Sequence, residues 1–203
     1  MNANKGLLLV VSGPSGVGKG TVCKYLAENE TNIFLSVSAT SRQPREGEVD
    51  GQHYYFVTQK QFDTMIENDE LLEYAKYISS CYGTPKKPCF DRLNKGDNVI
   101  LEIEVQGGTE VKEKYPETVM IFMVPPNMDI LKDRLAGRGT ETEEAVEQRI
   151  KRAYEEFGYL DKYDYIVVND DVIKASERIK AIICAEKQKV QRITDNIKKE
   201  LKI

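Results

Sequence analysis

Four short apolar runs, each bounded by turn residues, recur along the chain, and each is followed by a segment with helical spacing. They cover residues 7–11, 99–105, 119–124 and 165–168. Short buried strands that alternate with helices are typical of a parallel sheet covered on both faces. The pattern therefore predicts an α/β fold of three layers, with a parallel sheet between two layers of helices.

The C-terminal third contains two long helical patterns. From Val146 onward, apolar residues recur at spacings of four and three, which places them on one face of a helix; they are Ile150, Ala153, Phe157 and Leu160. Thr140 and Glu143 have the spacing of a capping box at the start of this helix. A second long helix is predicted from about Val172 through Ile197.

Two segments depart from the alternation of strands and helices. Residues 37–87 contain short alternating pieces around a short helix near residues 59–68, which predicts a small inserted lobe with its own sheet. Residues 136–144 contain two glycines and no apolar residue after Ala136, which predicts an exposed segment.

Composition narrows the classes of function. At 203 residues the chain can bury one substantial core without a disulfide or metal. A net charge of -4 provides no general basic field for nucleic acid or membrane, and no apolar run approaches the roughly 18 residues of a membrane span. Four cysteines without a C-x-x-C pair and one histidine predict no zinc site, and favour a reducing, cytoplasmic location.

The clearest motif, GPSGVGKGT at residues 13–21, directly follows the first apolar run. Glycines let successive backbone N–H groups point inward, and the N-terminus of the next helix favours an anion. Gly13, Gly18 and Lys19 satisfy the pattern G-x-x-x-x-G-K. A turn that only reverses the chain is the alternative, but the strand, lysine and helix together favour phosphate binding. The expected loop is Gly13, Pro14, Ser15, Gly16, Val17, Gly18, Lys19, Gly20 and Thr21.

Gly20 stands where this motif usually has Ser or Thr. The missing hydroxyl is the one that normally ligates Mg²⁺ directly. We therefore expect Mg²⁺ to be held mainly by nucleotide phosphates and water, with no dedicated protein metal site.

Two pairs of charged residues are further candidates. Arg42 and Arg45 could close on one phosphate, although two solvated arginines in a turn would look the same. Glu102 and Glu104 are predicted on one face of a strand at its C-terminal end, where parallel sheets bind ligands. Their partner could be a base, a ribose, hydrated Mg²⁺ or an arginine.

The order of several segments resembles the guanylate kinase family from about residue 7 to 171. They are GPSGVGKGT, SVSATSRQPREGEVDGQHYYFV, LLEYAKY, CYGTP, ILEIEVQG, RLAGRGTETEE and YDYIVVND. This resemblance implies a P-loop nucleoside monophosphate kinase fold with three parts. They would be a core of residues 1–36, 87–135 and 148–203, a GMP-binding lobe of residues 37–86, and a lid of residues 136–147.

The resemblance also implies the reaction ATP + GMP = ADP + GDP, with dGMP as a further expected acceptor. The expected partners are ATP and GMP, and the chain would act as a monomer or homodimer. Implied catalytic residues are Lys19, Arg45, Arg138 and Arg149. The implied GMP site consists of Ser38, Arg42, Arg45, Tyr54, Glu73, Tyr82, Thr84, Glu102 and Glu104.

Some assignments stay open. Asn169 matches a family position near the adenine of ATP, but an Asn or Asp that caps the next helix is equally consistent with the local sequence. Arg134 and Arg152 could be lid contacts or solvated charges. Two other functions compete with this interpretation. The chain could be a kinase for another nucleoside monophosphate, or a binding module that has lost catalysis. Glu73 and its hydroxyl neighbours favour guanine, and Lys19 with the lid arginines favours activity.

Overall fold

The computed structural model describes residues 5–77, 80–137 and 143–203. Its centre is a five-stranded sheet in the order β2-β7-β1-β8-β9, in which every pair of neighbours is parallel. The strands are β1 Leu8–Ser12, β2 Ile33–Leu35, β7 Asn98–Glu102, β8 Val119–Val124 and β9 Tyr165–Val168. The predicted parallel α/β core is confirmed.

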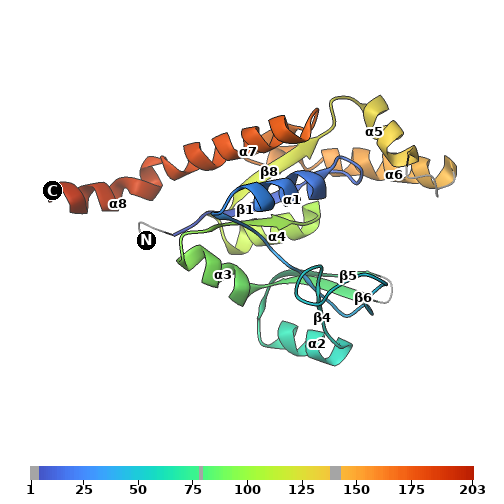
Figure 1. Cartoon of the computed structure of the whole chain (residues 1–203), viewed down its shortest axis with the longest axis horizontal. Coiled ribbons are helices and arrows are strands. Elements are labelled where there is room, and N and C mark those ends of the chain that lie inside the picture. Colours follow the sequence, from blue (N-terminus) through green and yellow to red (C-terminus); the bar gives the residue numbers. More distant parts are fainter. Residues whose placement is uncertain (1–4, 78–79, 138–142) are drawn as a thin grey trace.

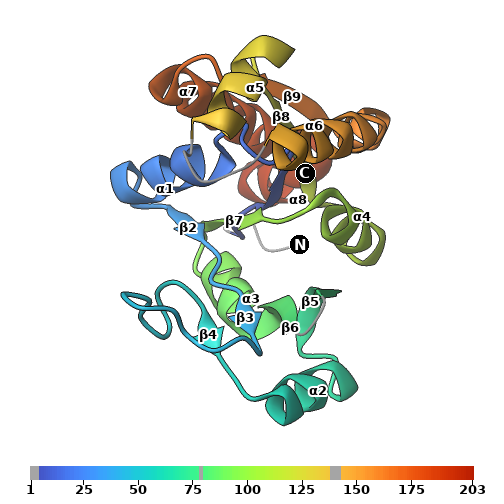
Figure 2. The ribbon, with the colours of Figure 1, turned by 90° about the vertical axis from the view of Figure 1, so that its right-hand side faces the viewer.

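Successive side chains of a strand point to opposite faces of the sheet and therefore pack against different helices. Leu9 and Val11 of β1 pack in a cluster with α1 and α7, whereas Val10 packs in a cluster with α3 and α4. The helices are α1 Lys19–Asn29, α3 Lys86–Asn94, α4 Val105–Lys114 and α7 Val172–Lys187. Figure 2 shows α1 and α4 on opposite sides of the central strands, which gives the three layers.

A second sheet lies below the core in both views (Figures 1 and 2). Its order is β4-β3-β6-β5, with β3 Ala39–Thr40, β4 Tyr55–Phe56, β5 Leu71–Tyr77 and β6 Ser80–Pro85. The helix α2 Gln59–Glu67 starts with a capping box between Thr58 and Gln61 and buries Phe62. The exact residue limits of core, lobe and lid remain predictions.

An irregular register between Leu71 and Tyr74 sets the direction of the β5 side chains. Leu71 packs in the cluster of the lobe, and Leu72 packs in the core cluster beside α3 and α4. Glu73 is also buried, so three consecutive residues face the interior instead of alternating. A bulge breaks strict alternation in this way and can re-aim a side chain toward a site.

The C-terminal helical prediction was wrong in one respect. The chain forms two helices, α7 and α8 Val190–Leu201, because Lys189 leaves the helical conformation between them, with φ -59° and ψ 133°. At the break, the buried Glu186 accepts hydrogen bonds from Tyr165 at 2.6 Å and Arg192 at 3.2 Å, and pairs with Lys189 at 2.5 Å. On one straight helix, the side chains of residues 186 and 192 would point in different directions. The bend therefore allows Arg192 as well as Lys189 to neutralise the Glu186 carboxylate.

The other helices frame the C-terminal edge of the sheet. They are α5 Met128–Ala136 and α6 Glu143–Phe157, which pack together through Leu131, Leu135 and Ala153, and a short 3-10 turn at Leu160–Lys162. The expected capping residue Thr140 lies outside the described residues. In the described ranges, no helix has the length and apolar character that crossing a membrane requires.

Candidate functional site

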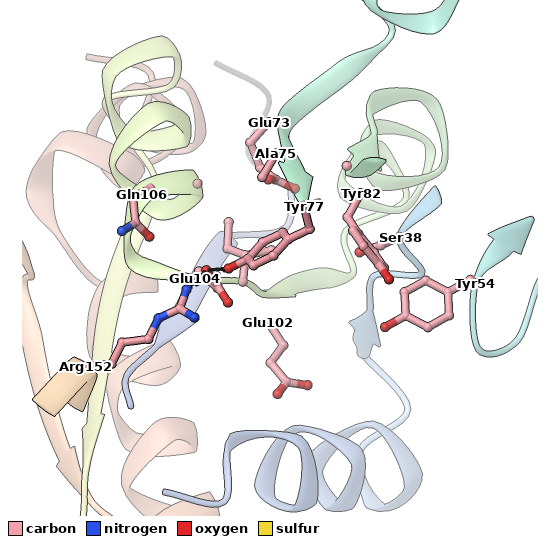
Figure 3. Close-up of a pocket in the computed structure, with 13 residues that line it drawn as sticks. Ser38, Tyr54, Glu73, Ala75, Tyr77, Tyr82, Glu102, Glu104, Gln106 and Arg152 are labelled. Atoms are coloured by element: carbon pink, nitrogen blue, oxygen red, sulfur yellow. Dashed lines mark hydrogen bonds and ion pairs between the residues drawn. The ribbon is translucent and has the colours of Figure 1, made fainter. Parts of the chain in front are cut away.

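A cavity of about 550 Å³ opens between the core and the inserted lobe. The core contributes Glu102, Glu104 and Arg152, and the lobe contributes Glu73, Tyr77 and Tyr82 (Figure 3). Its size is within the range of small-molecule sites. The carboxyl ends of β1 and β7 point toward this region, which is where parallel sheets bind their ligands.

The glycine-rich loop between β1 and α1 has the backbone conformation that phosphate binding needs. Gly13 and Gly18 have φ values of 142° and 93°, where a side chain would be strained. A Cβ on Gly13 would lie 2.2 Å from the Met123 carbonyl oxygen, and one on Gly18 would lie 2.5 Å from Asn169 Nδ2. The loop therefore requires glycine at both positions, and it delivers Lys19 at the first residue of α1.

The ammonium group of Lys19 lies within the curve of this loop. Its Nζ donates to the carbonyl oxygens of Gly13 at 2.5 Å and Pro14 at 3.2 Å. Burial lowers the pKa of Lys19, although the nearby carboxylates of Glu102 and Glu156 act in the opposite direction. A partly desolvated cation of this kind is suited to bind a polyanion.

Glu102 faces the position where the motif departs from its usual form. A Cβ built on Gly20 would lie 3.4 Å from both carboxylate oxygens of Glu102. The side chain is open to the cavity, yet the surrounding protein raises the pKa of its carboxyl, while Lys19 lowers it. Figure 3 shows this carboxylate directed toward α1, between the phosphate loop and the lobe.

The back of the phosphate loop is fixed by two side chains from other elements. Asn169, which is 3% exposed, donates from Nδ2 to the Val17 carbonyl at 2.8 Å. Arg134 donates to the carbonyls of Val17 at 3.2 Å and Asn169 at 3.0 Å. The N-cap of α7 is Asp171, so Asn169 is not the capping residue. Arg134 acts here as a structural contact of the loop.

Arg149 reaches the same loop from α6. Its Nη2 donates to Ser15 Oγ at 2.6 Å, across 134 residues of sequence. This contact brings an arginine of the segment after the expected lid to the edge of the phosphate loop. Arg138, the other expected lid arginine, lies outside the described residues.

A buried polar pair forms the floor of the cavity on the lobe side. Thr84 Oγ1 donates to Glu73 Oε1 at 2.7 Å, and these residues are 0% and 6% exposed. Burial raises the pKa of the Glu73 carboxyl, whereas the Thr84 hydrogen bond and Lys114 lower it. A Cβ on Gly107 would lie 2.8 Å from Glu73 Oε2, so only glycine in α4 leaves room for this carboxylate.

The two lobe arginines have different surroundings. Arg42 makes a bidentate pair with Glu48, at 3.0 and 2.9 Å, and its guanidinium lies 5.5 Å from the centre of the Tyr54 ring. The pair with Arg42 lowers the pKa of Glu48 to about 2. Arg45 is exposed, and its backbone N–H donates to Glu48 at 2.7 Å. Glu48 thus organises the turn that carries both arginines.

The lobe is connected to the core by a cluster around Glu104. Tyr77 of β5 donates its hydroxyl hydrogen to Glu104, and Arg152 of α6 donates to the Tyr77 oxygen at 2.8 Å and to Glu104 at 3.3 Å. The prediction that Glu102 and Glu104 share one strand was wrong, because β7 ends at Glu102 and Glu104 is the N-cap residue of α4. Both carboxylates nevertheless line the same cavity.

The donor set is compatible with Mg²⁺ bound together with a nucleotide. The described residues contain no group of three or more His, Cys, Asp or Glu side chains that could enclose an ion. Glu102 supplies a carboxylate without a hydrogen-bond partner among the described residues, adjacent to Lys19 and the phosphate loop. Mg²⁺ prefers oxygen ligands, retains several waters and commonly combines one or two carboxylates with substrate phosphates. Glu102 fits such a site.

Comparison with known proteins agrees with this arrangement. A family model described as guanylate kinase matches residues 5–186 of the chain. The chain belongs to the guanylate kinase family. It is 54% identical over 191 residues to a guanylate kinase of Caldanaerobacter subterraneus subsp. tengcongensis, which covers 94% of this chain and 93% of the relative.

Two further proteins support family membership over nearly the full chain. A guanylate kinase of Clostridium acetobutylicum is 53% identical over 195 residues, which cover 96% of this chain and 93% of the relative. The crystal structure of guanylate kinase from Anaplasma phagocytophilum superimposes with a TM-score of 0.77 at 33% identity, covering 98% of this chain and 97% of that one. The fold expected from the resemblance to the guanylate kinase family is therefore confirmed.

Most of the residues that the family resemblance implied are located around one cleft. Ser38, Tyr54, Glu73, Tyr82, Glu102 and Glu104 line the cavity, and Thr84 supports it through Glu73. Sequence reasoning missed Tyr77 and Glu48. Tyr77 lies two strand positions from Ala75, another residue of the cavity wall, and strand periodicity could have identified it. Glu48 was detectable as an acid six residues after Arg42.

Proposed function

We propose that this site transfers the γ-phosphoryl group of ATP to GMP, with GDP and ADP as products. The observation that carries the proposal is the buried pair of Glu73 and Thr84 in a nucleotide-sized cavity beside a phosphate loop. Membership of the guanylate kinase family supports the same reaction.

In this proposal Glu73 reads the guanine base. The Watson–Crick edge of guanine offers two donors, N1–H and the exocyclic amine, and a carboxylate can accept from both. Thr84 holds one carboxylate oxygen at 2.7 Å and thereby orients the group. Ser38, which lines the cavity beside Tyr82 (Figure 3), offers a hydroxyl for O6. Adenine would present an unprotonated N1 to the carboxylate, which leaves both acceptors unmatched.

Arg42, Arg45, Tyr54 and Tyr82 would bind the phosphate of GMP. Arg42 is already oriented by Glu48 and packs against Tyr54, so a phosphate would meet a guanidinium that is largely preorganised. Tyr54 and Tyr82 form an edge-on ring contact at 5.9 Å, which directs both rings to the same wall. Arg45 is exposed and can turn toward an incoming phosphate.

ATP would occupy the loop of residues 13–21. The backbone N–H groups and Lys19 would bind its outer phosphates, and Asn169 would lie near the adenine end, where its buried side chain holds the Val17 carbonyl of the loop. Mg²⁺, when bound with ATP, supplies positive charge that neutralises the transferring phosphoryl group. Glu102 would hold the hydrated ion from the core side.

Transfer itself requires mainly alignment and positive charge. The acceptor is already an anionic phosphate, so the residues need not include a strong general base. Arg45 and Arg149 would converge on the transferring group from lobe and α6, and Arg138 from the lid would join them. Closure of lobe and lid excludes water, which would otherwise accept the phosphoryl group and hydrolyse ATP.

The experiment that tests the proposal is a coupled ADP-release assay with ATP, Mg²⁺ and each nucleoside monophosphate in turn. We expect strong turnover with GMP, measurable turnover with dGMP, and little with AMP, CMP or UMP. Preference for another monophosphate would reassign the base site. Nucleotide binding without ADP release would favour a binding module that has lost catalysis. Cytoplasmic location and a monomeric or homodimeric state remain predictions.

A further inference from the structure

A second cavity, of about 710 Å³, lies at the opposite end of the core sheet from the phosphate loop. Leu7 and Leu8 line it at the start of β1, whereas the phosphate loop follows the end of the same strand. The chain elements around it are α3, the segment after α4, the end of α7 and the start of α8. In Figure 1 these elements gather near the two termini, away from α5 and α6.

The rim of this cavity is strongly positive although the whole chain carries a net charge of -4. Its cations are Lys5, Lys95, Lys114, Lys187 and Arg192, and its single carboxylate is that of Glu117. Arg192 already pairs with Glu117 at 3.6 Å and with the buried Glu186 at 3.2 Å, whereas the four lysines have no carboxylate partner in the described chain. Clustered cations repel one another, and the binding of an anion reduces this repulsion.

The interior of the cavity is apolar and contains an aromatic wall. Phe90 and Tyr115 lie with ring centres 5.6 Å apart, and Lys5 lies 5.7 Å from the centre of the Phe90 ring. Leu93 and Ile193 complete this surface from α3 and α8. A flat apolar ring would find van der Waals and stacking contacts here.

Two buried polar atoms in the cavity wall have no hydrogen-bond partner among the described residues. They are Thr118 Oγ1, whose residue is 2% exposed, and Arg192 Nε. Buried polar groups are normally paired, because an unpaired one costs about 1–3 kcal/mol. Both atoms are shielded from the cavity itself, so they mark a wall with unpaired polar groups and are not contact points of a ligand.

We propose that this cavity binds a small anionic molecule that combines a flat ring with a phosphate, sulfonate or carboxylate group. The ring packs against Phe90 and Tyr115, and the anionic group meets Lys95, Lys187 and the neighbouring cations at the rim. The site is separate from the cleft that holds the phosphate loop, because the two cavities share no lining residue.

The test uses 8-anilinonaphthalene-1-sulfonate, a fluorescent ring system with one sulfonate, as the probe. We expect saturable binding to the full chain that Lys95→Glu and Lys187→Glu each weaken about fivefold. Lys174→Glu is the matched control, because Lys174 is an exposed residue at the other end of the helix that carries Lys187. Circular dichroism would check that each variant folds. Unchanged binding in the two cavity variants would overturn the proposal.

Two further arms separate the parts of the proposal. Binding should persist in Lys19→Met, which removes the phosphate-loop cation, and its loss there would relocate the probe to the catalytic cleft. Phenyl phosphate should displace the probe at lower concentration than inorganic phosphate or phenol. If inorganic phosphate displaces the probe as well as phenyl phosphate does, the aromatic wall is not part of a ligand site. If phenol displaces it as well as phenyl phosphate does, the positive rim is not part of one.

Discussion

The hydroxyl of Thr84 donates a 2.7 Å hydrogen bond to the buried carboxylate of Glu73, and the two residues lie on the antiparallel strands β6 and β5. Thr84 satisfies one oxygen of this carboxylate, and the other lies beside Gly107 at the start of α4, in the wall of the cavity. The pair therefore holds an oriented acceptor at the junction of lobe and core.

Replacement of Glu73 by Gln should lower kcat/KM for GMP about tenfold to a hundredfold, because the amide presents a donor to the two donors of guanine. Steady-state kinetics with GMP, IMP and AMP would measure the change. IMP lacks the exocyclic amine and should lose less than GMP. Glu67→Gln is the control, since Glu67 is an exposed carboxylate on α2 of the same lobe. An unchanged preference for GMP over AMP would remove Glu73 from base recognition.

The Tyr77 hydroxyl joins the lobe to the core through Glu104 and Arg152. Tyr77→Phe retains the ring contact with Tyr82 but removes both polar contacts. We expect KM for GMP to rise about threefold to tenfold, with a smaller effect on kcat, because the lobe is less firmly held near the core. Small-angle scattering of the free enzyme should show a larger radius of gyration.

Tyr74→Phe provides the comparison for this variant, because Tyr74 lies on the same strand, is exposed and does not line the cavity. Equal kinetic effects of the two substitutions would show that the Tyr77 hydroxyl does not connect lobe and core. If Tyr77→Phe raises KM but leaves the radius of gyration unchanged, the Tyr77 hydroxyl acts only through contact with the substrate.

The sequence predicted the central architecture because its determinants are local. The runs that became β1, β8 and β9 are short, apolar and bounded by turns, and such runs have few alternatives to burial in a parallel sheet. The phosphate loop was equally accessible, since its glycines and Lys19 act through neighbouring backbone. The break before α8 was missed because it depends on Glu186, whose partners Tyr165 and Arg192 lie in other elements.

Contacts between residues far apart in the sequence could not be predicted from local patterns. Asn169 and Arg134 both bind the Val17 carbonyl, although 152 and 117 residues separate them from it. No periodicity encodes such distances, and family resemblance supplied only an alignment position for Asn169. Glu104 was assigned to a strand because alternation continues past Glu102, but the backbone turns there to begin α4.

The pair of Arg42 and Glu48 leads to a prediction about pH. The folded-state pKa of Glu48 is about 2, below the ordinary value of 4.5, so its contribution to stability is present above pH 4.5 and is lost as the pH falls toward 2. Urea denaturation at a series of pH values should show wild type and Glu48→Gln converging across this range. Because both side chains keep some contact with solvent, at 17% and 18% exposure, screening should keep the difference near neutral pH small.

Glu46→Gln is the matched substitution for this measurement, because Glu46 is an exposed acid in the same turn. Its stability relative to wild type should stay nearly constant over the same pH interval. Suppose instead that wild type exceeds Glu48→Gln in free energy of unfolding by the same amount at acidic and at neutral pH. The Arg42 pair would then not lower the pKa of the Glu48 carboxyl.

The position of Glu102 over Gly20 predicts how the loop responds to a restored hydroxyl. Both Ala and Ser fit at residue 20, since the added Cβ would meet the Glu102 oxygens at 3.4 Å, an ordinary contact distance. Ala should stabilise α1 by at most about 1 kcal/mol and Ser by about half as much, because both are better helix formers than glycine and Ala is better than Ser. Only the serine hydroxyl can bind Glu102 or enter the coordination sphere of Mg²⁺.

Gly20→Ser should therefore shift the Mg²⁺ concentration that gives half-maximal turnover, whereas Gly20→Ala should leave it near the wild-type value. Titration of activity with MgCl₂ at fixed ATP and GMP measures this, and urea denaturation verifies the expected gain in stability for both variants. If Ser and Ala give the same Mg²⁺ dependence, the ion does not bind beside residue 20. Glu102 would then act on Lys19 or on the substrate instead. A shift confined to Ser would place hydrated Mg²⁺ between the phosphate loop and Glu102, where glycine leaves space for water.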